Sequence, residues 1–297
     1  MATLEFTKMH GCGNDYIYVD ALHTRPADPA ALSRTLSDRH FGIGSDGLIL
    51  LAPSRVADMR MEMYNADGGR GEMCGNGIRC LAKLAYERGI VRKDRVSIET
   101  DCGLKLIDLK LKSGRVAGAT VDMGAPIFEG RDIPVAASGR IVGYPLEIGD
   151  RIEHITAISM GNPHCVIFVE DDAVFRLDPH EFGRLGRPFE HHKFFPRRVN
   201  TEFILPISRT HLRMRVWERG SGETLACGTG ACAALVAAVI TGRAERSATL
   251  SLGGGDLEIE WRESGEGADH VFMTGNAVEV CRGTVEIGSD EMVPVAA

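Results

Sequence analysis

The chain has 297 residues, of which 44% are hydrophobic and 25% charged, a composition typical of a folded globular protein. Its formal net charge of −7 argues against general affinity for nucleic acids, which bind basic faces, and no apolar run approaches the roughly 18 residues of a membrane-spanning helix. Residues 1–20 lack the apolar core of a secretory signal, so the eight cysteines are expected to be reduced thiols of a cytoplasmic protein.

The first half of the chain is predicted to consist mainly of short strands. A Gly-Asn turn at residues 13–14 leads into an apolar strand that ends on Asp20. Apolar and polar residues alternate with period two over residues 59–65, which is typical of a half-buried strand. Further strands are predicted over residues 96–100, 104–112 and 116–123, and helices over residues 28–38 and 78–88.

The second half repeats this order of elements. A Gly-Asn turn at residues 161–162 again opens an apolar strand, which ends on Glu170. Residues 212–218 alternate in the same way as residues 59–65. Further strands are predicted over residues 248–252, 257–261 and 270–274, and helices over residues 180–186 and 231–240.

The strongest repeat surrounds two cysteines that lie 153 residues apart. Cys74 is followed by Gly-Asn-Gly and Cys227 by Gly-Thr-Gly, and each motif opens a predicted helix. In both copies nine residues separate the aromatic residue of the preceding strand from the cysteine, so the register holds without an insertion. A weaker match pairs residues 45–50 with residues 200–205 at a separation of 155. A gene duplication is the simplest explanation of this order.

Strands outnumber helices and do not alternate regularly with them, so the predicted fold class is α+β rather than doubly wound. The helix over residues 231–240 is almost entirely apolar, which is typical of a helix buried on every side. We therefore predict two pseudo-symmetric domains from a duplication, each a curved, antiparallel-rich sheet or barrel around one central buried helix. The predicted domains are residues 1–122 with 274–297, and residues 123–273.

A cysteine at the start of a helix has distinctive acid–base properties. The first backbone amides of a helix lack internal partners, and the helix dipole places partial positive charge there, which favours the thiolate. We therefore expect the pKa values of Cys74 and Cys227 to be lowered. The glycines after each cysteine let a carboxylate approach the free amides. Each motif thus predicts a proton-transfer group beside an anion site.

Two such thiols facing one carbon atom from opposite sides would suit an epimerase or a racemase. One thiolate would remove the proton from a stereocentre, and the opposing thiol would return a proton to the other face. Helix amides would stabilise the charge that develops on the adjacent carboxylate, and a closing cleft would exclude water. The sequence contains no recognisable motif for pyridoxal phosphate or a metal, so no cofactor is expected.

Several ordered motifs resemble those of the diaminopimelate epimerase family. The resemblance extends from residue 6 to residue 275, and its most specific blocks lie at residues 64–80, 159–164 and 218–232. It implies cofactor-independent conversion of LL-diaminopimelate into meso-diaminopimelate, a precursor of lysine and peptidoglycan, with Cys74 and Cys227 as the catalytic pair. It also implies a small diamino dicarboxylic acid as the substrate and a homodimer as the assembly.

The same resemblance implies a set of substrate-binding residues. By motif position its members are Asn14, Asn65, Gly75, Asn76, Asn162, Asn200, Glu218, Arg219, Gly228 and Thr229. Arg219 can hold a carboxylate through two parallel hydrogen bonds, and asparagines can donate and accept, which suits a zwitterion. Glu218 and His164 are expected to tune the thiols. The family often has glutamine where this chain has Gly47.

Simpler interpretations exist for several of these residues. Asn65, Asn162 and Asn200 lie near turns or strand ends, where asparagine commonly closes a turn, and His164 could be a turn histidine. The pair at residues 191–192 consists of two histidines, but no carboxylate or thiol accompanies it at ligand spacing. The sequence therefore predicts no metal site.

Three other functions fit parts of the sequence. A proline or hydroxyproline racemase shares the two-domain plan and the opposed cysteines, but such enzymes resemble Cys-Gly-His-Gly at the first motif, where this chain has Asn76. A cysteine-dependent hydrolase could pair Cys227 or Cys74 with His164, but it gives no reason for a second matched cysteine. A non-catalytic binding protein could also be built on a duplicated domain.

Overall fold

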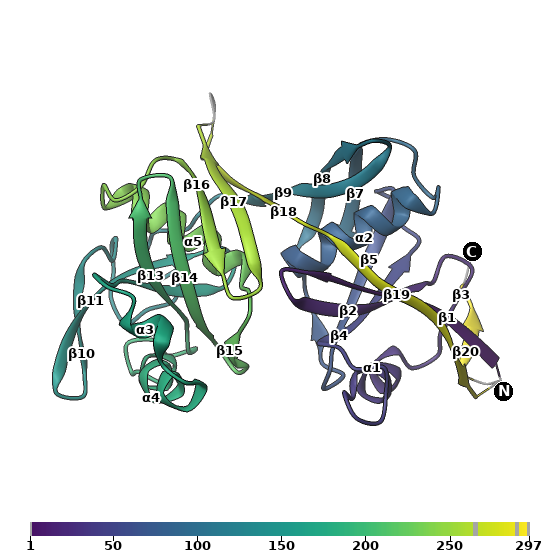
Figure 1. Ribbon diagram of the computed structural model, residues 1–297, viewed down its shortest axis with the longest axis horizontal. Helices are drawn as coiled ribbons and strands as arrows, with labels where there is room; N and C mark the ends of the chain where they lie inside the picture. The colour runs from purple at the N-terminus through teal and green to yellow at the C-terminus, as the bar shows by residue number, and fades with distance from the viewer. Residues whose placement is uncertain (1, 264–266, 289–290, 296–297) are drawn as a thin grey trace. The chain divides into compact units, whose positions relative to one another are not determined.

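The computed structural model describes residues 2–263, 267–288 and 291–295. The chain divides into two compact units (Figure 1). The first unit comprises Met1–Val121 with Gly275–Ala297, and the second comprises Asp122–Thr274.

The first unit is a curved sheet of mainly antiparallel strands. In order of pairing, its strands are β19 (Val278–Ile287), β1 (Ala2–Gly11), β2 (Asn14–Asp20), β4 (Gly47–Ala52), β5 (Met59–Asn65), β7 (Arg95–Thr100), β8 (Gly103–Lys112) and β9 (Arg115–Gly124). The short β6 (Arg70–Gly71) pairs with β5, while β3 (Thr24–Pro26) and β20 (Met292–Pro294) form a separate ribbon. Helix α1 (Pro29–Ser37) connects β3 to β4, and α2 (Gly75–Glu87) connects β6 to β7.

The second unit repeats this arrangement strand for strand. In order of pairing, its strands are β10 (Tyr144–Ile148), β11 (Arg151–Ser159), β12 (Pro163–Phe168), β13 (Asn200–Ser208), β14 (His211–Glu218), β16 (Ser247–Leu252), β17 (Gly255–Arg262) and β18 (His270–Gly275). The short β15 (Gly222–Thr224) pairs with β14, as β6 does with β5. Helices α3 (Ala173–Arg176) and α4 (Pro179–Glu190) precede β13, and α5 (Gly228–Ile240) precedes β16. The predicted α+β duplication is confirmed.

The helix after each cysteine is central because it joins two parallel strands. Strands β5 and β7 run parallel, as do β14 and β16, and a parallel pair requires a crossover connection. Helix α2 contacts β1, β2, β4 and β8, and α5 contacts β11, β12, β13, β16 and β17, so each sheet curves around its helix. In α5 every residue from Gly230 to Ala238 is buried, as its apolar sequence predicts. Helix α2 instead carries a partly exposed ion pair between Lys83 and Glu87.

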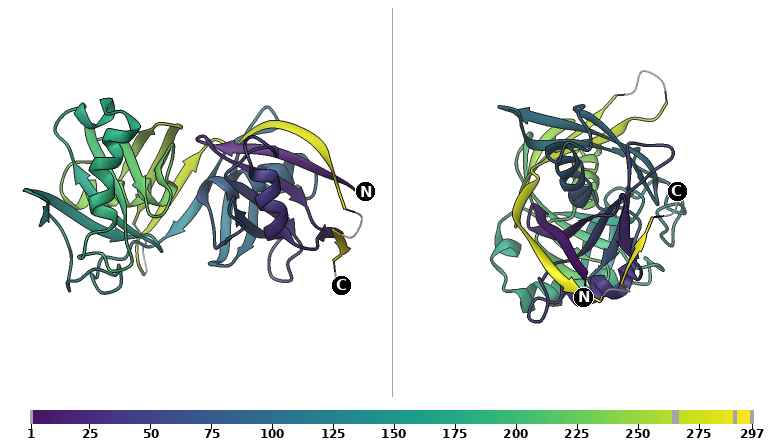
Figure 2. Two further views of the ribbon diagram at one scale, coloured as in Figure 1. Left: turned by 90° about the horizontal axis from the view of Figure 1, so that it is seen from below. Right: turned by 90° about the vertical axis from the view of Figure 1, so that its right-hand side faces the viewer.

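A second helix covers the outer face of the sheet in each unit. All six residues of β4 are buried, because Leu48 and Leu50 pack with Leu32 of α1 while Ile49 faces α2. In the second unit Phe203 of β13 packs against the aromatic residues of α4. Figure 2 (left) shows α1 in purple and α4 in teal green, each lying along its own unit. Each sheet is therefore covered on both faces, which fixes the strand ends that carry the site.

The structure extends or adds to several predicted elements. Helix α4 runs four residues beyond its predicted end, and its start is fixed by a capping box between Asp178 and Glu181. The short α3 and strands β1, β10, β11 and β19 lie in segments for which the sequence yields no predicted element. Within the described residues, no helix combines the length and the apolarity needed to cross a membrane. All eight cysteines are free thiols.

The contact between α4 and β14 leads to a stability prediction. A Cβ added at Gly186 would lie 2.6 Å from Cγ and 2.7 Å from Cβ of Trp217, atoms too near the backbone to swing away. We expect Gly186→Ala to lower the free energy of unfolding by about 1–3 kcal/mol, although alanine favours a helix over glycine. Gly183→Ala is the matched control, since its Cβ would meet the same ring at an ordinary 3.4 Å. If both variants unfold at the same temperature as the parent, the close contact between Gly186 and Trp217 is contradicted.

Candidate active site

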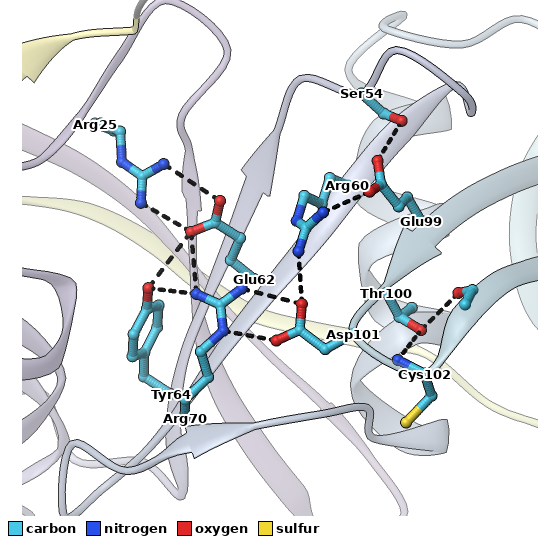
Figure 3. A network of polar contacts seen from close by, with 11 residues as sticks. Arg25, Ser54, Arg60, Glu62, Tyr64, Arg70, Glu99, Thr100, Asp101 and Cys102 are labelled. Atoms are coloured by element: carbon cyan, nitrogen blue, oxygen red, sulfur yellow. Dashed lines mark hydrogen bonds and ion pairs between the residues drawn. The ribbon is translucent and has the colours of Figure 1, made fainter.

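Cys74 is the N-cap residue of α2, as predicted. Its sulfur accepts a hydrogen bond from the Gly77 backbone N–H at 3.4 Å, and its thiol lies 3.2 Å from Oδ1 of Asn14. The loop before it is tied down by Arg70 of β6, whose guanidinium lies 2.6 Å from Asp101 and also donates to the Tyr64 hydroxyl (Figure 3). The end of β6 is therefore fixed only a few residues before the thiol.

Two predicted binding residues of the first unit are held by charged neighbours. Asn14 donates its amide to Asp46 at 2.7 Å, which leaves Oδ1 directed at Cys74. Asn76 is buried, and its Oδ1 accepts a hydrogen bond at 2.9 Å from Arg79, a fully buried cation within α2. The guanidinium of Arg79 also donates to the Gly75 carbonyl at 3.0 Å. Asn14, Gly75, Asn76 and Cys74 therefore lie in one hydrogen-bonded region of the first unit.

Cys227 is the N-cap residue of α5 and is only 5% exposed. Its sulfur lies 3.6 Å from the Thr229 hydroxyl. Two carboxylates lie close by, because the Glu218 side chain interacts with the thiol and a carboxylate oxygen of Glu202 lies within 4.8 Å of it. The Thr224 hydroxyl donates a short hydrogen bond to Glu218. The second thiol thus lies among acidic groups.

His164 connects this cluster to a predicted binding residue. The ring is fully buried, with Nδ1 2.7 Å from Oε1 of Glu202 and Nε2 2.9 Å from Oδ1 of Asn162. Because both ring nitrogens have partners, His164 does more than close a turn. The predicted roles of Asn162 and His164 therefore rest on one hydrogen-bonded chain that ends beside Cys227.

The prediction that the pKa values of Cys74 and Cys227 are lowered is wrong, because both are raised above the usual value of a thiol. Burial raises the pKa of Cys74, and the backbone amides of Gly77 and Asn76 only partly offset it. Burial raises the pKa of Cys227 well above its usual value, and the carboxylates of Glu218 and Glu202 raise it further. Burial also raises the pKa of the Glu218 carboxyl. Desolvation outweighs the helix terminus at both sites, although Cys74 is only half-buried while Cys227 is buried.

Three of the remaining predicted binding residues lie at strand ends, and Gly228 lies at the start of α5. Asn200 is buried; its amide donates to the Pro163 carbonyl at 3.1 Å, and its Oδ1 accepts from the Arg219 backbone N–H at 2.8 Å. The Arg219 side chain is exposed and donates to the Arg197 carbonyl at 3.3 Å. Asn65 is exposed at the end of β5. Gly228 is half-buried in the first turn of α5.

Gly47 occupies a position where a side chain does not fit. A Cβ added there would lie 2.1 Å from the Tyr64 carbonyl oxygen and 3.0 Å from the ring of Tyr16. The backbone here pairs with Asn65 across β4 and β5. A glutamine at this position would therefore require a local change in the backbone.

Sequence reasoning missed Glu202 and Arg79 as parts of the site. The weaker repeat match at a separation of 155 is wrong, because Leu48 pairs with Tyr64 as Thr201 pairs with Trp217, a separation of 153 in both strands. With the correct register Glu202 corresponds to an apolar residue of β4. A lone acidic residue directly before the apolar run at residues 203–205 is the signal that could have found it.

The cluster of His164, Glu202 and Cys227 contains side-chain types that bind metals, and their potential ligand atoms lie within 4.8 Å of one another. Both nitrogens of His164 are already hydrogen bonded, one of them to Glu202 itself. The geometry therefore suits proton transfer better than metal coordination. At residues 191–192, the Nδ1 atom of His192 accepts the backbone N–H of Phe194, and His191 is half-exposed.

Comparisons with known proteins identify the relatives of this chain. The diaminopimelate epimerase family model matches residues 6–129 and 156–280. A diaminopimelate epimerase from Desulfovibrio desulfuricans is 50% identical over 287 residues, covering 94% of this chain and 97% of that protein.

Two solved structures share the fold at low identity. A PhzF-family phenazine biosynthesis protein from Bacillus anthracis has a TM-score of 0.72 at 18% identity, covering 97% of this chain and all of that one. A probable proline racemase from Agrobacterium radiobacter has a TM-score of 0.67 at 16% identity, covering 97% and 93%. Identities this low show the fold alone. The family match and the close relative together establish that this chain belongs to the diaminopimelate epimerase family.

Proposed function

We propose that the protein interconverts LL- and meso-diaminopimelate by transferring protons between the substrate and the thiols of Cys74 and Cys227. The observation that carries this proposal is that the two repeated units each place a cysteine at the N-cap of their central helix. A hydrolase or a binding protein would require only one such thiol or none. Two equivalent thiols match a reaction in which a proton leaves one face of a carbon atom and another proton is added to the opposite face.

In the proposed mechanism one thiolate removes the α-proton of the substrate and the other thiol supplies a proton to the opposite face. The carbanion that forms is stabilised by delocalisation into the adjacent carboxylate. The free amides at the starts of α2 and α5 are preorganised donors for those oxygens. Burial raises the pKa of both thiols, and a thiolate of raised pKa is a stronger base toward a weakly acidic carbon.

The binding set is proposed from the motif positions of its members and from their contacts. Arg219 has an exposed guanidinium whose one partner among the described residues is a backbone carbonyl, so it can exchange that contact for a carboxylate of the substrate. Asn200 fixes the Arg219 backbone. Asn14 and Asn162 lie beside the cysteine or the histidine of their own unit. Asn65, Asn76, Glu218, Thr229 and the glycines Gly75 and Gly228 complete the set.

Four further properties belong to the proposal. The reaction as written moves only protons, so it requires no cofactor. The two thiols must stay reduced, which favours the cytoplasm. The enzyme is proposed to act as a homodimer, which light scattering of the purified protein can test. The proposed substrate is a small diamino dicarboxylic acid.

The function is tested by separating stereoisomers after incubation with the purified chain. We expect LL-diaminopimelate to approach an equilibrium mixture with the meso isomer without added pyridoxal phosphate or metal. L-proline and trans-4-hydroxy-L-proline serve as parallel substrates, because the rival racemase shares the fold. Inversion of proline without inversion of diaminopimelate would contradict the proposal and favour the rival.

A further inference from the structure

Glu202 is a fully buried carboxylate whose hydrogen bonding is incomplete. Its Oε1 lies 2.7 Å from Nδ1 of His164, and both side chains are 0% exposed. Its other oxygen, Oε2, has no hydrogen-bond partner among the described residues. Burying a carboxylate is costly, and a purely structural carboxylate normally has partners for both oxygens. Glu202 therefore calls for a functional explanation.

The carboxylate of Glu202 lies close to the thiol of Cys227, with an oxygen within 4.8 Å of the sulfur. Glu202 projects from β13 toward the first turn of α5, where a Cβ added at Gly230 would lie 2.6 Å from Oε1 and 3.2 Å from the sulfur of Cys227. Because Gly230 has no Cβ, the carboxylate can approach the helix start closely. Its negative charge opposes the partial positive charge of the helix terminus at that point.

The first unit has no carboxylate at the corresponding position. In the shared strand register Ile49 corresponds to Glu202, and its Cδ1 would lie 2.6 Å from a Cβ added at Gly77. By the same register Tyr16 corresponds to His164. The two units therefore share the backbone arrangement, but the residue that contacts the helix start is apolar in the first unit and acidic in the second.

The charged groups around the two thiols consequently differ in sign. Three titratable side chains face Cys227, one from each neighbouring strand: His164 from β12, Glu202 from β13 and Glu218 from β14. The groups nearest Cys74 are Tyr16 and Tyr18 from β2 and Cys80 and the cation Arg79 from α2. The carboxylate of Asp46 is separated from Cys74 by Asn14 and is paired with Arg39. The pair of Glu202 and His164 carries a net charge of zero or −1, whichever way the ring is protonated. It therefore gives a thiolate at Cys227 no net positive neighbour.

We propose that Glu202 is a positioning residue that keeps the proton on Cys227 in the resting enzyme, so that Cys74 is the thiol that ionises first. The inference rests on the proposed function and assigns the two thiols of that mechanism different resting states. The pKa directions agree with it, since the carboxylates of Glu218 and Glu202 add to burial at Cys227, whereas Arg79 and Tyr16 oppose burial at Cys74. The resting enzyme then holds one base and one acid before the substrate enters.

The test is the pH dependence of alkylation at each cysteine. The protein is treated with iodoacetamide across a pH series, and peptide mass spectrometry gives the midpoint of reaction for Cys74 and for Cys227. In the parent we expect the lower midpoint at Cys74. In Glu202→Gln we expect the Cys227 midpoint to fall by about one pH unit or more, with the Cys74 midpoint unchanged, because a negative charge beside the thiol is lost. An unchanged Cys227 midpoint, or a parent in which Cys227 reacts first, would overturn the proposal.

Companion variants separate charge from packing. Glu202→Asp keeps the charge and should keep the Cys227 midpoint near that of the parent. Glu202→Ile introduces the residue of the first unit, and it should lower the midpoint if Glu202→Gln fails to fold. Glu62→Gln removes another buried carboxylate, which pairs with Arg25 in the first unit (Figure 3), and it should leave the Cys227 midpoint unchanged.

Alkylation needs no substrate, so the two proposals can fail separately. A parent that shows the expected midpoints but does not invert diaminopimelate contradicts only the proposed function. A parent that inverts diaminopimelate, combined with a Glu202→Gln variant whose midpoints are unchanged, contradicts only the inference about Glu202.

Discussion

Replacing either Cys74 or Cys227 by alanine is expected to lower kcat for epimerisation by about 10²–10⁴-fold, the usual contribution of a positioned acid or base. Among the described residues, each cysteine is the only thiol at the N-cap and in the first turn of its helix, so no neighbouring thiol can replace it as the proton-transfer group. Serine variants should be similarly impaired, because a hydroxyl ionises far less readily than a thiol. Steady-state kinetics in both directions, with calorimetric titration of the substrate, measure the effect and show that binding is largely kept.

The helices also supply matched controls for the cysteine variants. Cys80 lies in α2 and Cys232 in α5, and both are fully buried. Both lie inside their helices and not at the N-cap, so neither is beside the backbone amides of the helix start. Alanine at either position should keep kcat within a few-fold of the parent in protein that remains folded. If the Cys74 or Cys227 variant also retained near-parent kcat, the two-thiol mechanism would be wrong.

Arg219→Ala is expected to raise KM for diaminopimelate by about 10- to 100-fold with a smaller change in kcat. A hydrogen bond to a charged group contributes about 1.5–3 kcal/mol, and each 1.4 kcal/mol is tenfold in affinity. Arg219→Lys should recover only part of this, because an ammonium cannot form the two parallel bonds of a guanidinium. Initial rates over a range of substrate concentrations separate KM from kcat.

The control for Arg219 removes an equal charge elsewhere in the second unit. Arg209 is exposed and pairs with Glu245, and neither residue belongs to the proposed site. Arg209→Ala should therefore leave KM unchanged at moderate ionic strength. A parallel rise in KM for the Arg209 and Arg219 variants would indicate a general electrostatic effect in place of a specific carboxylate contact.

Much of the architecture follows from local sequence patterns. The alternation over residues 59–65 and 212–218 and the Cys-Gly-X-Gly motifs predicted the two strands and the two helix starts that the structure shows. The apolar composition of α5 predicted its burial. These features depend on neighbours within one element, so sequence alone determines them.

The environment of each thiol could not be predicted in this way. Whether Cys74 or Cys227 is easier to ionise depends on desolvation and on charges from other strands, which the position of a helix start does not reveal. Glu202 reaches Cys227 only because β13 lies beside the helix, and a match shifted by two residues hid its correspondence to Ile49. The contacts of Arg79 with Asn76 and Gly75 also depend on its burial inside the sheet.

The most direct test of the two-thiol mechanism is the conversion of LL-diaminopimelate in deuterated water, stopped at low conversion. A proton delivered by the second thiol comes from solvent, so the account predicts meso product that carries deuterium at the inverted carbon while the recovered LL substrate remains protiated. Product that retains the original hydrogen, or substrate that gains deuterium as fast as product forms, would show that a single group moves the proton and would contradict the account.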